Sequence, residues 1–334
     1  MSIRVPAEWE KQEFILLVFP YPQSDWQHSI HEIRLAYANL IRTLLPYQRC
    51  VVLCQDQQAL NTYLEPSQNL TSIVIDFNDT WIRDFGIIGA YENQKLKLYD
   101  FTFNAWGGKF DAQKDNRVNQ KLQKTGLFDA TPMETIDFVL EGGSIDSNGD
   151  GVILSTQNCI YNQNRNPQYS PEQIQKKLKT LLGARELIVL KHGGLEGDDT
   201  DSHIDTLARF IDPKTIAYVA CHDTADTHHD ALALMEQELK KTGFDLLPLP
   251  LPKAQFFQNH RLPATYLNFI FINNALIVPT YDDPQDAEVL GTLQGFFPNR
   301  DVIGVDARVF IREHGSLHCA SMNYFCYNSN PTNS

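Results

Sequence analysis

Basic residues and long apolar runs are both scarce in this sequence. Its 334 residues include 28 lysines and arginines against 41 aspartates and glutamates, a formal net charge of −13. Such a surface repels the phosphates of nucleic acids and of anionic lipids. No stretch approaches the roughly 18 uninterrupted apolar residues of a membrane-spanning helix, and the N-terminus lacks the apolar core of a signal peptide. We therefore expect a soluble cytoplasmic protein that binds neither nucleic acid nor membrane and attracts cationic ligands.

Cysteine is also scarce, with six residues and no CxxC pair. This spacing excludes a disulfide scaffold and leaves a buried apolar role as the default for each cysteine. Two patterns imitate metal sites, namely the group Cys221, His222, His228 and His229 and the calcium-loop-like run 146–151. The first lacks the spaced pairs of a zinc site, and the second lacks the glutamate required at its twelfth position. We interpret them as surface or helix-end residues and as a hairpin turn.

Helix and strand patterns recur along the whole chain. Five segments have the apolar spacing of amphipathic helices: 30–45, 113–125, 171–182, 227–242 and 284–296. Polar turns join strand pairs near residues 93, 148–151, 212–213 and 273–274, at intervals of roughly sixty residues. Apolar strand-like runs follow the helices. The sequence therefore predicts an α/β fold with one ring of about five strand–strand–helix–strand units.

The fifth hairpin of such a ring is missing from the chain interior. The apolar run 14–19 and the segment 315–325 can supply it by pairing with each other, which closes the ring. An open α/β sheet is the alternative, because alternating strands and helices are typical of doubly wound folds too. A nucleotide site has no support, since neither GxGxxG nor GxxxxGK[ST] occurs.

Polar residues gather where strands meet loops, in the segments 78–84, 140–145, 196–205 and 315–319. A ring brings all four to one central opening. The i, i+2 spacing of His203 and Asp205 predicts that both lie on one face of a strand as an acid/base pair. Cys319 follows a small-residue turn and a histidine, so its thiolate can be a nucleophile if the loop lies over His203. The alternatives are a solvated acidic loop and a buried structural cysteine.

These segments together resemble the agmatine deiminase family, close to the bacterial peptidyl-arginine deiminases, within the guanidine-modifying pentein superfamily. The matching stretches span essentially the whole chain in family order: VPAEWE, NDTWIRDFG, LEGGSI, CIYNQNRNP, GDDTDSHIDTLARF, TYLNF and SLHCASMN. The resemblance implies a five-bladed α/β propeller, with pseudo-fivefold ββαβ-type repeats around a central active site. It also implies that residues 1–334 form a single pentein catalytic domain.

The resemblance implies a role for five residues. Cys319 is the nucleophile, His203 the acid/base, and Asp84 and Asp205 the carboxylates that grip a guanidinium. Glu141 is an additional active-site acid. The implied reaction hydrolyses agmatine to N-carbamoylputrescine and ammonia through a covalent amidino-cysteine, and it needs no metal and no organic cofactor.

Acidic residues around the motifs favour a dicationic substrate. We expect Asp79, Asp198 and Asp199 to contribute to substrate binding, and Trp81 to pack on the aliphatic chain or cation. The alternatives are a peptidyl-arginine deiminase that forms citrulline, an amidinotransferase, and a non-catalytic pentein-fold binding protein. A homo-oligomer is compatible with the sequence but is not predicted by it.

Three places depart from the family pattern. Ser202 stands where the family usually has glycine, and residues 314–316 replace a glycine-rich turn before Cys319. Residues 320–323 also differ from the usual run. We expect these changes to affect rate or loop geometry rather than the type of reaction.

Overall fold

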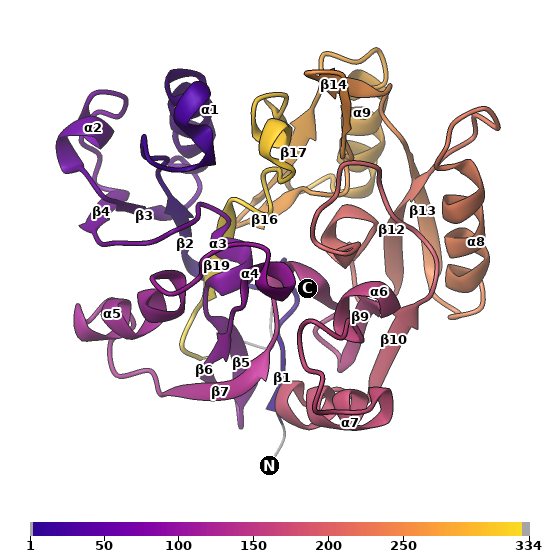
Figure 1. The fold of residues 1–334 in the computed structure, drawn as a ribbon, viewed down its shortest axis with the longest axis horizontal. Coiled ribbons are helices and arrows are strands. Elements are labelled where there is room, and N and C mark those ends of the chain that lie inside the picture. The colour runs from indigo at the N-terminus through magenta and orange to yellow at the C-terminus, as the bar shows by residue number, and fades with distance from the viewer. Residues whose placement is uncertain (1–2, 329–334) are drawn as a thin grey trace.

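Five sheets of the molecule share one arrangement within residues 3–328, the part of the chain that the computed structural model describes (Figure 1). In each sheet a central strand pairs antiparallel with one neighbour and parallel with another. The central strands are β2 (Gln12–Val18), β6 (Lys95–Thr102), β9 (Val152–Thr156), β12 (Thr215–Ala220) and β17 (Ala275–Thr280). Their antiparallel partners are β19 (Ser321–Phe325), β5 (Ile88–Glu92), β8 (Ile145–Ser147), β11 (Ala208–Phe210) and β16 (Ile270–Ile272). Their parallel partners are β3 (Arg49–Cys54), β7 (Met133–Val139), β10 (Glu186–Leu190), β13 (Asp245–Pro250) and β18 (Asp301–Asp306).

One long helix connects each central strand to its parallel partner, because parallel neighbours need a crossover. These helices are α1 (Ile30–Leu44), α5 (Val118–Lys124), α7 (Pro171–Leu182), α8 (His229–Leu239) and α9 (Asp286–Phe296). Figure 1 shows them on the outside of the molecule, with the sheets between them and the centre. Shorter elements complete the chain: β1 (Ile3–Arg4), β4 (Leu70–Val74), β14 (Gln255–Phe257), β15 (His260–Leu262), α2 (Gln57–Asn61), α3 (Ile82–Phe85), α4 (Ala105–Gly108) and α6 (Gln157–Ile160).

The two ends of the described chain meet in one sheet. Strand β19 pairs antiparallel with β2, with Ser321 opposite Leu17, as the missing-hairpin argument predicted. The apolar side chains from Phe14 to Val18 are at most 1% exposed, since helices and neighbouring sheets cover both faces of β2. This closure fixes the loop before β19 against the N-terminal segment.

Local signals account for both ends of α7. The Ser170 hydroxyl accepts a hydrogen bond from the Gln173 N–H, and Pro171 occupies the first turn of α7. Gly183 ends α7 with φ of 64°, and a Cβ there would lie 1.9 Å from the Ile3 carbonyl oxygen, so no other residue fits. All five predicted helices are present. The second is shorter than expected, because a 3₁₀ turn at Asp115–Arg117 precedes α5.

The predicted strand through His203 and Asp205 is wrong. A 3₁₀ turn covers Ile204–Thr206, and β11 begins only at Ala208. The Thr206 hydroxyl and N–H both donate to the His203 carbonyl, which closes a tight turn in place of an extended segment.

In the described part of the chain, no helix combines the length and apolar character needed to cross a bilayer.

Candidate active site

Three predicted catalytic side chains converge on Gly143. This residue lies in the 3₁₀ turn η3 (Gly142–Ser144), at the start of β8. A Cβ on Gly143 would lie 2.6 Å from His203 Nδ1, 2.9 Å from Asp84 Oδ1 and 3.1 Å from Asp205 Oδ2. Asp84 comes from the polar segment 78–84, His203 and Asp205 come from 196–205, and Gly143 itself lies in 140–145, so the structure brings three of the four polar segments together as predicted. Only glycine leaves room for the three side chains.

Asp84 lies in the short helix α3 and is held at both oxygens. The Gly143 N–H donates to Oδ1 at 2.9 Å, and the Trp106 indole donates to Oδ2 at 2.9 Å. Trp106 has a left-handed backbone with φ of 53°, a strained conformation of the kind found at functional sites. Burial raises the pKa of Asp84 to about 6, against the lowering effect of His203.

Asp205 presents one free oxygen. Its Oδ2 accepts a hydrogen bond from His318 Nδ1 at 2.7 Å, and this bond lowers the pKa of the carboxyl despite the opposing effect of burial. Its Oδ1 is buried and has no hydrogen-bond partner among the described residues. A buried unpaired acceptor is costly. Asp205 therefore holds an oxygen ready for a cationic donor.

Cys319 joins this cluster through Asp205 and Asn268. Its Sγ lies 3.8 Å from Asp205 Oδ2 and 3.5 Å from Asn268 Oδ1. The same Asn268 oxygen accepts the main-chain N–H groups of His318 and Cys319 at 2.9 and 3.3 Å. Burial, together with the charges of Asp205 and Asp84, raises the pKa of the Cys319 thiol well above its usual value. The thiol is neutral until a cation offsets these carboxylates.

His203 has no close hydrogen bond at either ring nitrogen within the described structure. Nδ1 lies 3.6 Å from Asp84 Oδ1, and Nε2 lies 3.6 Å from Glu141 Oε2. Burial opposes its protonation, but Asp84, Cys159 and Glu141 raise the pKa of His203 well above the usual value. Its ring is therefore a protonated acid that faces a carboxylate on each side without a short hydrogen bond to either.

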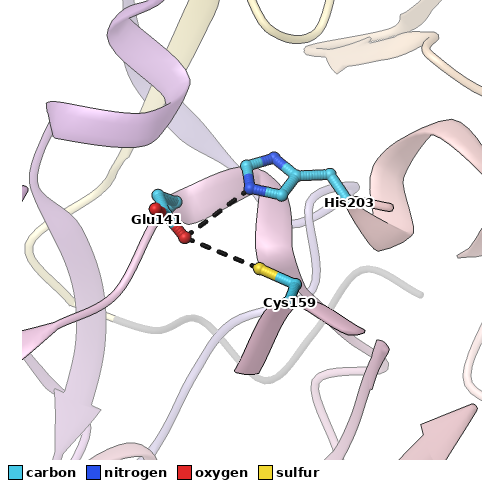
Figure 2. A group of neighbouring side chains, drawn as sticks. All are labelled: Glu141, Cys159 and His203. Carbon is cyan, nitrogen blue, oxygen red and sulfur yellow. Dashed lines mark hydrogen bonds and ion pairs between the residues drawn. The ribbon is translucent and has the colours of Figure 1, made fainter. Parts of the chain in front are cut away.

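Glu141 is held by a residue that sequence reasoning did not assign. Arg165 Nε donates to both Glu141 oxygens at 2.9 and 2.8 Å, while its Nη1 pairs with Asp201 at 2.7 Å. Cys159 Sγ lies 3.6 Å from Glu141 Oε2 (Figure 2). Both Cys159 and Arg165 belong to the CIYNQNRNP run. That run was the signal that could have identified them.

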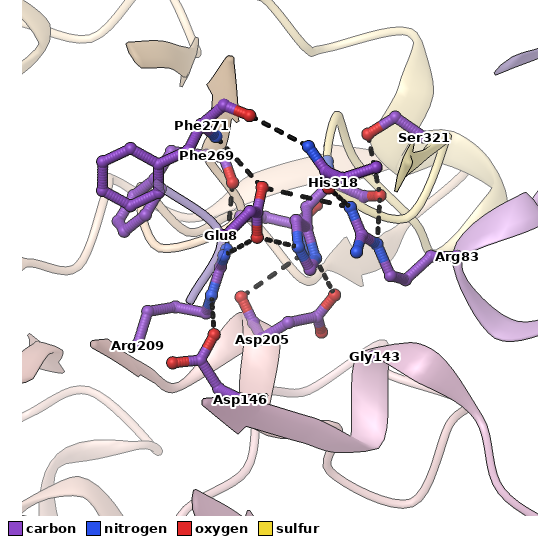
Figure 3. Close-up of polar contacts among 12 residues, drawn as sticks. Glu8, Arg83, Gly143, Asp146, Asp205, Arg209, Phe269, Phe271, His318 and Ser321 are labelled. Carbon is purple, nitrogen blue, oxygen red and sulfur yellow. Dashed lines mark hydrogen bonds and ion pairs between the residues drawn. The ribbon is translucent and has the colours of Figure 1, made fainter. Parts of the chain in front are cut away.

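A second charged cluster adjoins Asp205 (Figure 3). The two ring nitrogens of His318 contact Asp205 Oδ2 at 2.7 Å and Glu8 Oε2 at 2.8 Å. Glu8 also accepts from the Phe271 N–H at 3.0 Å and pairs with Arg209. Both ring nitrogens of His318 are thus within hydrogen-bond distance of a carboxylate oxygen, which fixes the orientation of the ring. The VPAEWE motif thus supplies Glu8, which contacts Asp205 through His318.

An acidic cavity of about 250 Å³ adjoins the cluster. Trp81 and Trp106 are among its lining residues, and Trp106 reaches Asp84 from there. Its acidic lining residues are Asp25, Asp79, Asp199 and Glu313. Burial, together with the charge of Asp115, raises the pKa of Asp79 to about 8, and burial also raises those of Asp199 and Glu313. The cavity is therefore suited to a second positive charge.

The predicted substrate-binding residues differ in their positions. Trp81, Asp79 and Asp199 line the cavity. Asp198 is not among its lining residues, because both its oxygens accept hydrogen bonds from its own loop, from Thr200 and Ser202. Its assignment to substrate binding gains no support from this position.

The unusual turn residues adopt conformations that favour glycine. Ser202 has φ of 69° and His314 has φ of 68°, both in the left-handed region. The turns are thus formed without glycine, at a local conformational cost.

Comparisons of the sequence identify relatives of this chain. The family model of the Porphyromonas-type peptidyl-arginine deiminases matches residues 4–324. The putative agmatine deiminase of Mycoplasma capricolum is 30% identical over 94% of this chain and 93% of its own length. The agmatine deiminase of Pseudomonas aeruginosa (strain LESB58) is 29% identical over 95% of this chain and 94% of its own.

Solved structures show the same relationship. A cysteine-to-serine variant of the C. jejuni agmatine deiminase with substrate bound is 46% identical, with a TM-score of 0.95 over 98% of this chain and 97% of that one. A putative arginine deiminase from Porphyromonas gingivalis is 40% identical, with a TM-score of 0.93 over 98% of this chain and 100% of the other. DDAH from Pseudomonas aeruginosa, at 13% identity and a TM-score of 0.54 over 94% of this chain and 100% of its own, shows a related α/β pentein fold. The chain belongs to the Porphyromonas-type peptidyl-arginine deiminase family.

Proposed function

We propose that this protein is an agmatine deiminase, which releases ammonia from agmatine and forms N-carbamoylputrescine. The observation that carries the proposal is the convergence of Asp84, His203 and Asp205 at Gly143, next to Cys319 and an acidic cavity. The relatives named as agmatine deiminases support it. The five repeated sheets and the β19–β2 closure support a five-bladed propeller formed by one catalytic domain.

Asp84 and Asp205 bind the substrate guanidinium as paired carboxylates. The free Oδ1 of Asp205 accepts one N–H, and Asp84, ionised above its pKa of about 6, accepts another. The cation offsets the two charges that raise the pKa of Cys319. Substrate binding therefore favours loss of the thiol proton to solvent, since His203 is already protonated, and it orients the guanidinium carbon toward Sγ.

Chemistry then proceeds in two steps. Cys319 Sγ forms a bond to the guanidinium carbon, His203 gives its proton to a terminal nitrogen, and the C–N bond breaks with loss of ammonia. Neutral His203 next takes a proton from water, whose oxygen adds to the same carbon. The remaining proton of the added hydroxyl passes to Sγ as the C–S bond breaks, which restores the Cys319 thiol and releases the ureido product. Arg165 holds the Glu141 carboxylate that faces His203 Nε2.

The acidic cavity selects for the far end of the substrate. An ammonium group in the cavity favours the ionised forms of Asp79, Asp199 and Glu313, whose pKa values burial raises, whereas the α-carboxylate of arginine opposes their ionisation. We infer from this charge that agmatine is preferred over arginine. A peptidyl-arginine substrate is the second candidate because the family model carries that description.

A substrate panel tests the proposal. Ammonia release is measured with agmatine, arginine and a blocked arginyl peptide, using the wild-type chain and Cys319→Ser. We expect turnover with agmatine, none with the serine variant, and at least about tenfold lower kcat/KM with arginine, for a repelled charge costing about 1.4 kcal/mol or more. Turnover of the peptide without turnover of agmatine would replace the first candidate by the second.

A further inference from the structure

Three potential metal ligands face one another beside the proposed general acid. One group of potential metal ligands is found within residues 3–328, and it consists of Glu141, Cys159 and His203. Each of the three places one ligand atom within 4.8 Å of the other two. They come from the residue before η3, from α6 and from the residue before Ile204–Thr206 (Figure 2). All three side chains are buried. Cys159 has no role in the proposed reaction.

Two of the three distances among these atoms are close to the edges of a tetrahedral site, and the third is at most 4.8 Å. Cys159 Sγ and His203 Nε2 each lie 3.6 Å from Glu141 Oε2. Around Zn²⁺, with bonds of about 2.3 Å to sulfur and about 2.0 Å to nitrogen or oxygen, such atoms lie about 3.3 to 3.5 Å apart. Movements of a few tenths of an ångström close the gap, which is on the scale of thermal motion.

His203 supplies an independent reason. Both of its ring nitrogens are buried without a hydrogen-bond partner in the described structure, and Nε2 faces Glu141. A metal ion gives Nε2 the partner that it lacks. Asp84 Oδ1, 3.6 Å from Nδ1, is placed to accept the proton of the other nitrogen, as carboxylates do behind metal-bound histidines.

The surrounding charges permit a divalent cation. Arg165 holds the Glu141 carboxylate in place but opposes a cation. The negative charges of Glu141, Asp84 and a Cys159 thiolate outnumber it and leave the filled site close to neutral. Binding releases the Cys159 thiol proton and the extra His203 proton to solvent. A thiolate and an imidazole select Zn²⁺ over Mg²⁺ and Ca²⁺, which prefer oxygen ligands.

We propose that Glu141, Cys159 and His203 form a regulatory site for a thiophilic divalent cation such as Zn²⁺. Filling it places the ion on His203 Nε2, so the histidine can no longer transfer protons to or from substrate. Metal binding is independent of the proposed function, whereas the resulting inhibition rests on it. The site is distinct from a catalytic cofactor, because its occupation stops the reaction.

Direct binding is tested on the full, reduced chain after removal of metal with a chelator. Co²⁺ serves as the probe, because thiolate ligation gives a near-ultraviolet charge-transfer band, and Zn²⁺ affinity is measured by calorimetry. We expect the band in the wild type, in Cys319→Ala and in the partly exposed control Cys221→Ala. We expect Cys159→Ala and the closer-sized Cys159→Ser to lose the band and at least about tenfold of the Zn²⁺ affinity. Thermal unfolding verifies that both fold.

A band that persists in the Cys159 variants, or one that is lost in Cys319→Ala, overturns the proposal by placing the metal on the nucleophile.

Inhibition is then tested by ammonia release with Zn²⁺, with Mg²⁺ as the control cation and a chelator for reversal. We expect reversible inhibition of the wild type by Zn²⁺ alone, and at least about tenfold weaker inhibition of Cys159→Ser relative to its own metal-free rate. Equal sensitivity of the two proteins contradicts the regulatory role. Absence of turnover in metal-free wild type refutes the proposed function instead, and leaves the binding result standing.

Discussion

His203 and His318 are both buried and both lie between two carboxylates, yet their contacts differ. The His203 ring nitrogens stay 3.6 Å from Asp84 and Glu141, whereas those of His318 approach Asp205 and Glu8 to 2.7 and 2.8 Å. Short charge-assisted hydrogen bonds fix a ring, and longer contacts stabilise its charge without fixing it. A histidine that must pass protons to a substrate needs the second arrangement. One that orients a neighbouring carboxylate needs the first.

The largest expected effect is on the loosely held histidine. His203→Gln keeps the volume and polarity of the side chain but cannot transfer a proton at neutral pH. We expect kcat for ammonia release to fall by about 10² to 10⁴-fold, with little change in the urea midpoint. The surface variant His192→Gln is the control. A His203 variant that retains most of its rate would show that another group moves the proton.

Gly143→Ala tests whether the site needs the space at which its side chains meet. The added methyl would lie 2.6 Å from His203 Nδ1 and 2.9 Å from Asp84 Oδ1, so both must move. We expect kcat/KM to fall by about 10²-fold, as for other displacements of reacting groups. Gly291→Ala is the control, because neither Gly291 nor Gly143 is left-handed and nothing lies within 4 Å of a Cβ added to Gly291. Equal activity of the two variants would contradict the role of Gly143.

Glu8→Gln tests the tightly held histidine. The change removes the charge that Arg209 and His318 share, in a network that is almost fully buried. We expect about 3 kcal/mol less stability to urea. Burial opposes ionisation of Glu8, but His318 and Arg209 lower its pKa, so this stability is present above about pH 4.3 and is lost as pH falls below that value. Glu10→Gln, in the same motif but partly exposed beside Arg4, should cost less than about 1 kcal/mol. Similar losses of stability in Glu8→Gln and Glu10→Gln would show that the buried contacts of Glu8 do not set it apart from a partly exposed glutamate.

The features that could be predicted from the sequence are those that depend on residues close together in the chain. Capping and periodicity are local, and they predicted α1 and α7 closely. Motif positions predicted that Asp84, His203 and Asp205 gather. The supports of each histidine were not predicted, because Glu8 and His318 are 310 residues apart and no local pattern marks their contact. The strand predicted at His203 failed because Asp201 and Ser202, both left-handed, turn the chain just before it.

Trp106→Phe alters the carboxylate next to His203 without touching the histidine. Substrate binding needs ionised Asp84, whose pKa of about 6 predicts that kcat/KM rises with pH through this value. Loss of the indole N–H removes a donor to the ionised form, so the pKa rises. We expect the acidic limb of the profile to move up by about 1 pH unit. The comparison variant is Trp26→Phe, since Trp26 donates to Thr80 rather than to a carboxylate. If the acidic limb does not move in Trp106→Phe, the titration that it reports belongs to a group other than Asp84.

The smallest expected effect concerns the loop that carries His203. Ser202→Gly removes the strain of a left-handed serine, about 1 to 2 kcal/mol, but adds about 0.5 to 1 kcal/mol of chain entropy in the unfolded state. We therefore expect a gain below about 1 kcal/mol in urea unfolding, with ammonia release changed by less than a factor of about 3, since the Ser202 N–H still donates to Asp198. His314→Gly is the paired measurement, because His314 has the same left-handed conformation before Cys319. This variant also loses the contact of the histidine ring with the Gly197 carbonyl, and we expect that loss to cancel the gain in stability. A large loss of activity in Ser202→Gly alone would show that the serine itself, and not the shape of its turn, sets the position of His203.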